Sequence, residues 1–516
     1  MKNKSILLLT IFPLLTGCSF MKIADNSGPI PSNNDATTPS DDKPNDNQNQ
    51  NSGDTNKPSD NNNSNNNENN NDEVVPTTDQ TFLDFFDYDS KVEIELKFTN
   101  ESITKLKEYA EGEGNSNFER NERYHPCTAK ITLNGNTTTF EELGVRMKGN
   151  LSRDTNFVDS QGHFDTNHLC HFKVSFNQTY DDNSFYYVHN WGNDEAGKKD
   201  RDGRKYGGMK KLDLKWNRNH DGTFTKEAYA LDAFRSEGVM AQHCNLVKLT
   251  VKSDSDEFTE IYQALESVDK RMLKAINKND DKGDLYKYTY TNEPATLNGY
   301  QDYQIGVEGP NYRPLYDLKT NETNNDFSSM KNFINEVKKT KKDDGLDGQD
   351  YYDNISKYMD VDNFLKFSAL SWIFGMPDDL RNNYNNYYIY FNKDNKAYFI
   401  PYDNDRCLGL RYGWDKDLKN VRWDETEAIG SGGFNQCPLI LRFVSGGSNN
   451  SHPVHQTSKD IYYQYCVEYA NKYLNDTRFQ EFTNHFEYAP SKNISHAGQD
   501  NDTFSTYASN KKATLN

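Results

Sequence analysis

The segment from residue 21 to residue 80 limits what this 516-residue chain can fold into. It contains the run "NQNQNSGDTNKPSDNNNSNNNENNNDE" and carries eleven carboxylates against three lysines, with almost no apolar side chains. A segment of this composition cannot bury enough apolar surface to offset its chain entropy. We therefore expect residues 18–80 to form a disordered tether, and a folded part to begin near residue 81.

The first twenty residues, "MKNKSILLLTIFPLLTGCSF", have the pattern of an export signal. Two lysines precede an apolar stretch from Ile6 to Leu15, which is too short to span a bilayer. The stretch ends in "LTGC", which resembles the lipobox of bacterial lipoproteins. The resemblance implies removal of residues 1–17 and lipidation of Cys18, and so a lipid anchor to the membrane at the bacterial cell surface or in the periplasm. The alternative is an ordinary signal peptide that contains a cysteine.

Charge and cysteine spacing exclude two classes of site. The formal net charge is -19, which argues against binding nucleic acid through a basic surface. The seven cysteines form no CxxC pair and the chain has no HExxH motif, so the sequence gives no case for zinc. Outside the membrane, cysteines other than Cys18 could form disulfides, in a pairing that the sequence does not define. These are Cys127, Cys170, Cys244, Cys407, Cys437 and Cys466.

The folded part is predicted to be rich in strands first and in helices later. The alternation in "KVEIELKF" predicts a strand, and "CTAKITLNGNTTTF" predicts a hairpin that turns at Asn134-Gly135. Further along, "TKEAYALDAFRSEGV" and "VDNFLKFSALSWIFG" have helical periodicity, and the second ends at Gly375. This order predicts an α+β fold with a strand-rich lobe over 81–300, a helix-rich lobe over 301–500, and a cleft between them.

Two neighbouring segments carry the chemistry of the chain. "MPDDLRNNYNNYYIYF" and "FIPYDNDRCLG" flank a predicted hairpin, and both place carboxylates beside apolar runs, which is costly without compensation. If the turn is Asp394-Asn395, the pairing places Asn386 opposite Asp403, close enough to share a hard cation. Asp378 would approach from the preceding loop. The sequence therefore predicts a magnesium site.

Two asparagines compete for one ligand position of this site. Asn383 has a five-residue spacing from Asp378, whereas Asn386 is favoured by the hairpin pairing. Asp405 adds a spare carboxylate. The simpler interpretation is that Asp378 and Asn383 form turns after a helix. Protein kinases, however, use the same order of catalytic Asp, metal-binding Asn, hairpin and metal-binding Asp.

Over about residues 140 to 445 the chain resembles the spore coat protein H (CotH) kinases, which have an atypical protein-kinase-like fold. The resemblance rests mainly on the two segments above and is supported by "GVRMKGNLSR", "ALDAFRSEGV", "YQALESVDKRML", "GDLYKY", "PLYDLKTN" and "CPLILRFV". It implies a two-lobed enzyme that uses ATP and Mg²⁺ to phosphorylate Ser or Thr of an exported protein.

The resemblance also implies roles for individual residues. Asp378 matches the catalytic aspartate, which orients the substrate hydroxyl and accepts its proton. Asp403 matches the metal-binding aspartate, and Asp405 would take a second magnesium or orient the first. The loop expected over the phosphates comprises Arg146, Lys148, Gly149, Asn150 and Ser152.

Three further residues are implied on the nucleotide side. Lys173 matches a lysine that pairs the α- and β-phosphates, and Lys148 is the alternative because "NHLCHF" departs from the family pattern before that strand. Glu227 could be the helix glutamate that pairs this lysine. Glu266 matches a glutamate near the nucleotide.

Two other functions stay open from the sequence. One is a non-catalytic surface-binding or adhesion protein, which the 33 tyrosines would suit. The other is a different ATP-dependent transfer on the same fold, such as AMP transfer or glutamylation. A spore-coat role does not follow from a lipid anchor and a tether.

Overall fold

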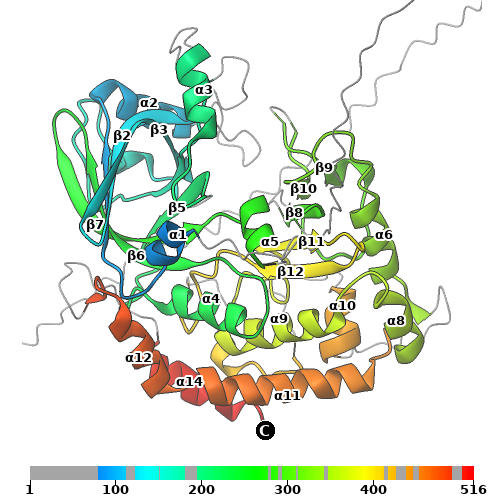
Figure 1. Ribbon diagram of the computed structural model, residues 1–516. Helices are drawn as coiled ribbons and strands as arrows, with labels where there is room; N and C mark the ends of the chain where they lie inside the picture. The colour runs from blue at the N-terminus through cyan, green and yellow to red at the C-terminus, as the bar shows by residue number, and fades with distance from the viewer. Residues whose placement is uncertain are drawn as a thin grey trace, which may run out of the picture. The chain divides into compact units, whose positions relative to one another are not determined.

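Seven strands from the N-terminal part of the described chain close into a barrel in the order β1-β2-β3-β4-β5-β7-β6 (Figure 1). In the computed structural model, the described residues are 79–111, 123–149, 152–180, 195–276, 281–288, 293–309, 312–341, 347–411, 417–425, 437–445, 452–490 and 502–516. The barrel strands are β1 (Val92–Lys97), β2 (His125–Leu133), β3 (Asn136–Lys148), β4 (His171–Ser175), β5 (Lys211–Trp216), β6 (Cys244–Lys252) and β7 (Glu257–Glu266). Neighbours are antiparallel except β1 and β6, whose parallel pairing closes the barrel.

Alternation along the barrel strands gives them one apolar face. In β1, Val92, Ile94 and Leu96 are buried in the barrel core, while the residues between them face outward. The predicted hairpin is confirmed: β2 and β3 join at Asn134 and Gly135, which both have positive φ, as a two-residue turn of this type requires. The segment "EELGVRMK" is the second half of β3 and not a separate strand.

A second sheet has the order β12-β11-β8-β10-β9. Its strands are β8 (Asp284–Tyr288), β9 (Ile305–Gly306), β10 (Tyr316–Leu318), β11 (Tyr387–Phe391) and β12 (Ala397–Pro401). The hairpin between β11 and β12 forms as expected, but its register differs from the expected one. The sheet also joins strands from both sides of residue 300.

The turn between β11 and β12 explains the register difference. Asn392 pairs with Lys396 through the backbone, so the loop has three residues, and Asn395 adopts the left-handed conformation. The Asn392 side chain accepts hydrogen bonds from the amides of Asp394 and Lys396, which stabilises this longer turn. Tyr387 therefore pairs with Pro401, and Asn386 lies opposite Tyr402. The expected pairing of Asn386 with Asp403 is wrong by one residue.

Two helices position the site. α4 (Lys226–Ser236) and α9 (Val361–Phe374) form where the helical periodicity predicts them, and they pack against each other. Asp360 caps the first turn of α9 by accepting from the Asn363 amide, and Gly375 ends the helix in the left-handed conformation. α9 is buried on nearly all sides because α11 (Gln456–Tyr473) runs alongside its other face (Figure 1).

The remaining helical elements surround these parts. They are α1 (Gln80–Phe85), α2 (Asn100–Glu111), η1 (Thr155–Phe157), α3 (Glu195–Gly203), α5 (Lys270–Ile276), η2 (Asp302–Gln304), α6 (Ser328–Val337), α8 (Gly348–Ile355), η3 (Leu418–Asn420), α10 (Pro438–Ile440), the π-helix η4 (Leu441–Ser445), α12 (Asp476–His485) and α14 (Phe504–Ala513). The fold is mixed α+β, as predicted. The closed barrel is a feature that the expected kinase-like lobe does not contain.

Candidate functional site

Strand β5 places two charged residues on the outer face of the barrel. Leu212 and Leu214 point into the barrel core, so Asp213 and Lys215, which alternate with them, face outward. Both are nevertheless buried, because other parts of the chain cover this face. Buried charges require ionic partners, and the two residues find theirs in two different groups of side chains.

The first group is the Lys215 set, which comprises Lys215, Glu227, Asp403 and Asp405. The Lys215 ammonium lies 2.9 Å from both carboxylate oxygens of Glu227, in the first turn of α4. It lies 2.7 Å from Asp403 and 3.5 Å from Asp405, in the loop after β12. Three carboxylates thus share one ammonium, which leaves an excess of negative charge when all are ionised.

The pKa values in the Lys215 set follow from this imbalance. Burial disfavours the charged ammonium, but Asp403, Asp405 and Glu227 together raise the pKa of Lys215 well above its usual value. Lys215 in turn holds the pKa of Asp403 below its usual value, against the effect of burial. Burial and the neighbouring carboxylates raise the pKa of Glu227 and of Asp405. A further cation would relieve this repulsion.

The second group is the Asp213 set, which comprises Asp213, Lys148 and Lys173. Asp213 lies 2.9 Å from the Lys173 ammonium and 3.2 Å from that of Lys148. The two ammonium groups hold the pKa of Asp213 below its usual value in spite of its burial. Lys173 also donates to Ser267 at 3.4 Å, and Lys148 lies 5.2 Å from the centre of the Tyr402 ring. The Asp213 set therefore has an excess of positive charge.

The expected pairing of Glu227 with Lys173 is corrected by these contacts. Glu227 pairs with Lys215, which the sequence analysis did not select, because Lys173 faces Asp213 directly across β4 and β5. A signal was present in "KLDLKW": an apolar strand with charges two residues apart places both on one face, just ahead of the helix that carries Glu227.

The phosphate loop expected after β3 begins with a tight turn. Gly149 has φ +92°, and a Cβ there would come within 2.0 Å of the Ser152 hydroxyl. That hydroxyl donates to the Lys148 carbonyl at 3.0 Å. Arg146 precedes the turn and lies over the Tyr124 ring. Asn150 lies outside the described residues.

Asp378 is held by a group of amides after the end of α9. Its carboxylate accepts from the side-chain amides of Asn383 at 2.5 Å, Asn385 at 3.0 Å and Asn386 at 3.0 Å. Arg406 lies 2.5 Å from its other side. Asn383 and Asn386, the two predicted metal ligands, therefore both direct their amide nitrogens to Asp378. Asp405 directly precedes Arg406, which pairs with Asp378.

The neighbouring Asp379 has a different environment. It is 4% exposed, and one carboxylate oxygen accepts from the Asn382 backbone amide at 2.8 Å. Burial raises its pKa to about 6. The Asp378 side chain is 17% exposed, so of the two adjacent aspartates Asp378 is the one that solvent can reach.

Backbone conformation marks the same region as unusual. Tyr384, Asn386, Asp403 and Leu408 all have φ between 49° and 55°, in the left-handed region that residues with a Cβ seldom adopt. Such conformations cluster at functional sites, where the surrounding structure compensates their cost.

The donor set fits a magnesium ion that is completed by phosphate oxygens. Among the described residues, no three His, Cys, Asp or Glu side chains come together as a ready-made metal cage. Magnesium is commonly held by one or two carboxylates with substrate phosphates and water. Asp403 and Asp405 suit this role, since their side chains are 38% and 24% exposed and both lie beside Lys215.

Glu266 belongs to a separate ion-pair network. One of its oxygens lies 2.5 Å from Arg271 and the other 2.7 Å from the His243 ring, and the residue is 2% exposed. These partners lower its pKa in spite of burial. Within the described part of the chain, both of its oxygens are engaged by residues outside the Lys215 and Asp213 sets.

Other sequence predictions concern the cysteines and the membrane. The six cysteines that could have paired are all buried and free in the structure. Cys18, the signal segment and nearly all of the tether lie outside the described residues. Of the helices in the described part, none is long and apolar enough to cross a membrane.

Comparison with protein families identifies a family to which the chain is similar. The family model described as CotH kinase protein matches residues 170–513, two thirds of the chain. The match includes both carboxylate segments and β5, and it begins after the Lys148–Ser152 turn. No curated protein matches the chain.

Proposed function

Since the chain belongs to the CotH kinase family, we propose that it is a phosphotransferase that moves the γ-phosphate of ATP to a Ser or Thr hydroxyl of an exported protein. The observation that carries the proposal is that two sets of charged side chains, with an excess of opposite sign, have their central residues Asp213 and Lys215 on the same strand, β5. The Asp213 set offers surplus positive charge two residues from the Lys215 set, which has surplus negative charge. A magnesium–triphosphate complex carries the two matching charges.

On this proposal the barrel and α4 form the nucleotide side of a kinase-like fold. Lys215, held in place by Glu227, corresponds to the lysine–glutamate pair that kinases require in place for activity. Lys148 and Lys173 would face the phosphates from the same outer face of the barrel, and the Gly149 turn would cover them. Lysine ammonium groups commonly bind phosphate oxygens, as point charges.

Magnesium, when bound by Asp403 and Asp405, would neutralise charge on the phosphate oxygens. The acceptor side belongs to Asp378. Its carboxylate, oriented by Arg406 and the asparagine amides, would hold the substrate hydroxyl and accept its proton as the oxygen bonds to the γ-phosphorus and ADP leaves. Asp379 is too buried for this role.

The test uses the purified chain, Mg²⁺ and ATP labelled at the γ- or the α-position, with casein as a generic acceptor. Transfer of the γ-label alone supports the proposal. Transfer of the α-label indicates nucleotide transfer on the same fold. If neither label moves and calorimetry detects no ATP binding, the surface-binding function is correct and the phosphotransferase proposal fails.

We further propose that Cys18 is lipidated and that the tether holds the folded part away from the membrane of a bacterial cell. The Cys18→Ser variant should leave the protein soluble or uncleaved, because no helix of the described part can replace the anchor. Cell fractionation checks this, and a tightly membrane-bound variant would contradict it.

A further inference from the structure

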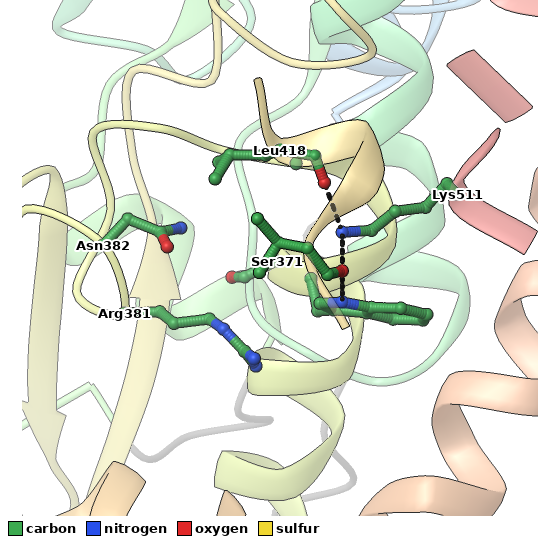
Figure 2. Close-up of a pocket in the computed structure, with 8 residues that line it drawn as sticks. Ser371, Arg381, Asn382, Leu418 and Lys511 are labelled. Carbon is green, nitrogen blue, oxygen red and sulfur yellow. Dashed lines mark hydrogen bonds between the residues drawn. The ribbon is translucent and has the colours of Figure 1, made fainter. Parts of the chain in front are cut away.

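A small pocket lies beside the end of α9. The proposed chemistry assigns no role to the residues that line it. It has a volume of about 10 Å³, room for one water molecule. Figure 2 shows Lys511 entering it from one side and Arg381 and Asn382 from the other. The lining residues are Ser371, Trp372, Gly375, Arg381, Asn382, Leu418, Val421 and Lys511.

Lys511, on the C-terminal helix α14, is an unusual residue to find there. It is 1% exposed, and its ammonium donates to the carbonyls of Leu418 at 2.8 Å and Val421 at 3.2 Å. It also lies 4.4 Å from the centre of the Trp372 ring. Burial and the nearby Arg381 lower its pKa well below the usual value. Burying the polar end of a lysine is costly unless it is hydrogen-bonded, and the two carbonyls provide these bonds.

These contacts connect α14 to the end of α9. Trp372 of α9 donates through its indole nitrogen to the same Val421 carbonyl that Lys511 uses, at 3.0 Å. One turn earlier on α14, the Tyr507 hydroxyl donates to the Ile373 carbonyl at 2.9 Å. Gly375 packs so closely on Tyr507 that a Cβ would lie 2.2 Å from its hydroxyl. α14 therefore fixes the last turn of α9 at several points.

The end of α9 in turn fixes the loop that carries Asp378. The Asn382 side-chain amide donates to the Met376 carbonyl at 2.7 Å and to the Asp379 carboxylate at 3.1 Å. The Asp379 carbonyl accepts the backbone amides of Asn383 and Asn385, whose side chains hold the Asp378 carboxylate. The side-chain oxygen of Asn382 is buried and accepts no hydrogen bond from the described residues, and Asn382 lines the pocket that Lys511 enters.

We propose that Lys511 is a positioning residue for phosphotransfer, which holds the Asp378 loop in place from behind through Trp372 and the pocket shared with Asn382. The inference rests on the proposed function for its effect on turnover, but its structural part does not. The amine group of Lys511 supplies what no apolar side chain could, which is hydrogen-bond donors for the Leu418 and Val421 carbonyls. α14 then supports the Asp378 loop from behind at the position of Lys511.

The test compares Lys511→Met with Lys512→Met, its neighbour on the same helix. Lys512 is partly exposed and does not line the pocket, so it is a matched control. Hydrogen–deuterium exchange reports on the loop without any need for activity. Exchange over residues 379–386 should be faster in Lys511→Met than in the wild type, because the amides of Asn382, Asn383 and Asn385 are the ones held by Asp379. Lys512→Met should match the wild type.

Activity gives the second measurement. Phosphate transfer by Lys511→Met should fall about 10- to 100-fold while its Kd for Mg-ATP stays close to that of the wild type, because displacing a catalytic group by about 1 Å can cost about 100-fold. If Lys511→Met does not fold, Lys511→Gln replaces it, since glutamine keeps one donor without the charge.

The outcomes separate the two proposals. Faster loop exchange in Lys511→Met, together with a wild-type protein that transfers no phosphate, would leave the positioning role standing and overturn the proposed function. Unchanged loop exchange in the variant overturns the positioning role. Equal losses of Mg-ATP affinity and of transfer, with exchange raised throughout the protein, also overturn it, because Lys511 would then serve general stability.

Discussion

The two charge sets on the outer face of the barrel differ in the sign of their excess charge. In the Asp213 set, two ammonium groups share one fully buried carboxylate. In the Lys215 set, one fully buried ammonium is shared by three carboxylates, two of them partly exposed. The central residues are two positions apart on one strand and both 2% exposed, so burial does not explain the difference.

The difference indicates what each set can bind. A surplus of ammonium groups can take up an anion, and a surplus of carboxylates can take up a cation. A self-contained structural network would be expected to balance its charges, because unpaired buried charge is costly. Glu266 provides the contrast: with Arg271 on one side and His243 on the other, its charge is satisfied internally. The two unbalanced sets are therefore the candidate for ligand binding.

The largest effect is expected from a residue outside both sets. Asp378→Asn should lower phosphate transfer by about 10²- to 10⁴-fold, the contribution of a positioned proton acceptor. Its affinity for Mg-ATP should stay close to that of the wild type, because neither charge set is altered. Labelled-ATP turnover beside calorimetry measures both.

The adjacent Asp379→Asn is the matched control for that variant. Asp379 is buried, and an asparagine there keeps an oxygen that can accept from the Asn382 amide, so transfer should fall far less than in Asp378→Asn. If the two variants lost activity equally, the loop as a whole and not the Asp378 carboxylate would be responsible.

Breaking the Lys215 set should be more severe than breaking the Asp213 set. Lys215→Met removes the lysine that three carboxylates share, and we expect transfer to fall by about 10²- to 10³-fold with a stability loss of about 3–5 kcal/mol. Adding Glu227→Gln should restore part of the stability but not the transfer, which thermal unfolding and turnover would show.

Lys173→Met is the corresponding change in the Asp213 set. Asp213 keeps its contact with Lys148, so stability should change little and ATP affinity should fall only about tenfold, the value of one hydrogen bond to a charged group. If Lys173→Met were the more damaging variant, the phosphate contacts of the Asp213 set, and not the Lys215 set, would contribute most to transfer.

The last effect concerns stability and not activity, and is a pH dependence at Asp379. Its pKa is raised to about 6 in the folded protein, so the folded state binds this proton more tightly than the unfolded state does. The stability it contributes is present below about pH 4 and is lost as the pH rises to about 6. The free energy of unfolding of Asp379→Asn should therefore rise relative to that of the wild type across this range, by at most about 3 kcal/mol at neutral pH.

Thermal unfolding at pH 4.5 and at pH 7 measures this difference. A difference between variant and wild type that did not change with pH would show that Asp379 is ionised throughout. For Glu266→Gln, the stability difference from the wild type should change with pH in the opposite direction. The pKa of Glu266 is lowered in the folded state, so the stability that it contributes is lost as the pH falls.

Much of the local structure could be predicted because it depends on short-range signals. Asn134-Gly135 requires a tight turn, Gly375 can end a helix in the left-handed conformation, and the periodicity of "VDNFLKFSALSWIFG" gives α9. The closure of the barrel was not predictable, because the parallel pairing of β1 with β6 joins residues about 150 positions apart.

The site was predictable only in part, for the same reason. Asp378, Asp403 and Glu227 lie in recognisable motifs, whereas Lys215 is defined by which carboxylates fold onto it. The hairpin register depended on whether the turn has two or three residues, and the Asn392 side chain decided that. Lys511 carries no motif, and its role follows only from the packing of α14 behind α9.

The central claim is that the Lys215 set binds the cation and the Asp213 set binds the phosphates. Calorimetry of ATP binding, with and without Mg²⁺, tests it most directly when Asp403→Asn is compared with Asp213→Asn. The account predicts that Mg²⁺ strengthens ATP binding in the wild type and in Asp213→Asn, and that Asp403→Asn loses this dependence. Wild-type ATP binding that ignores Mg²⁺, or a dependence that survives in Asp403→Asn and disappears in Asp213→Asn, would contradict it.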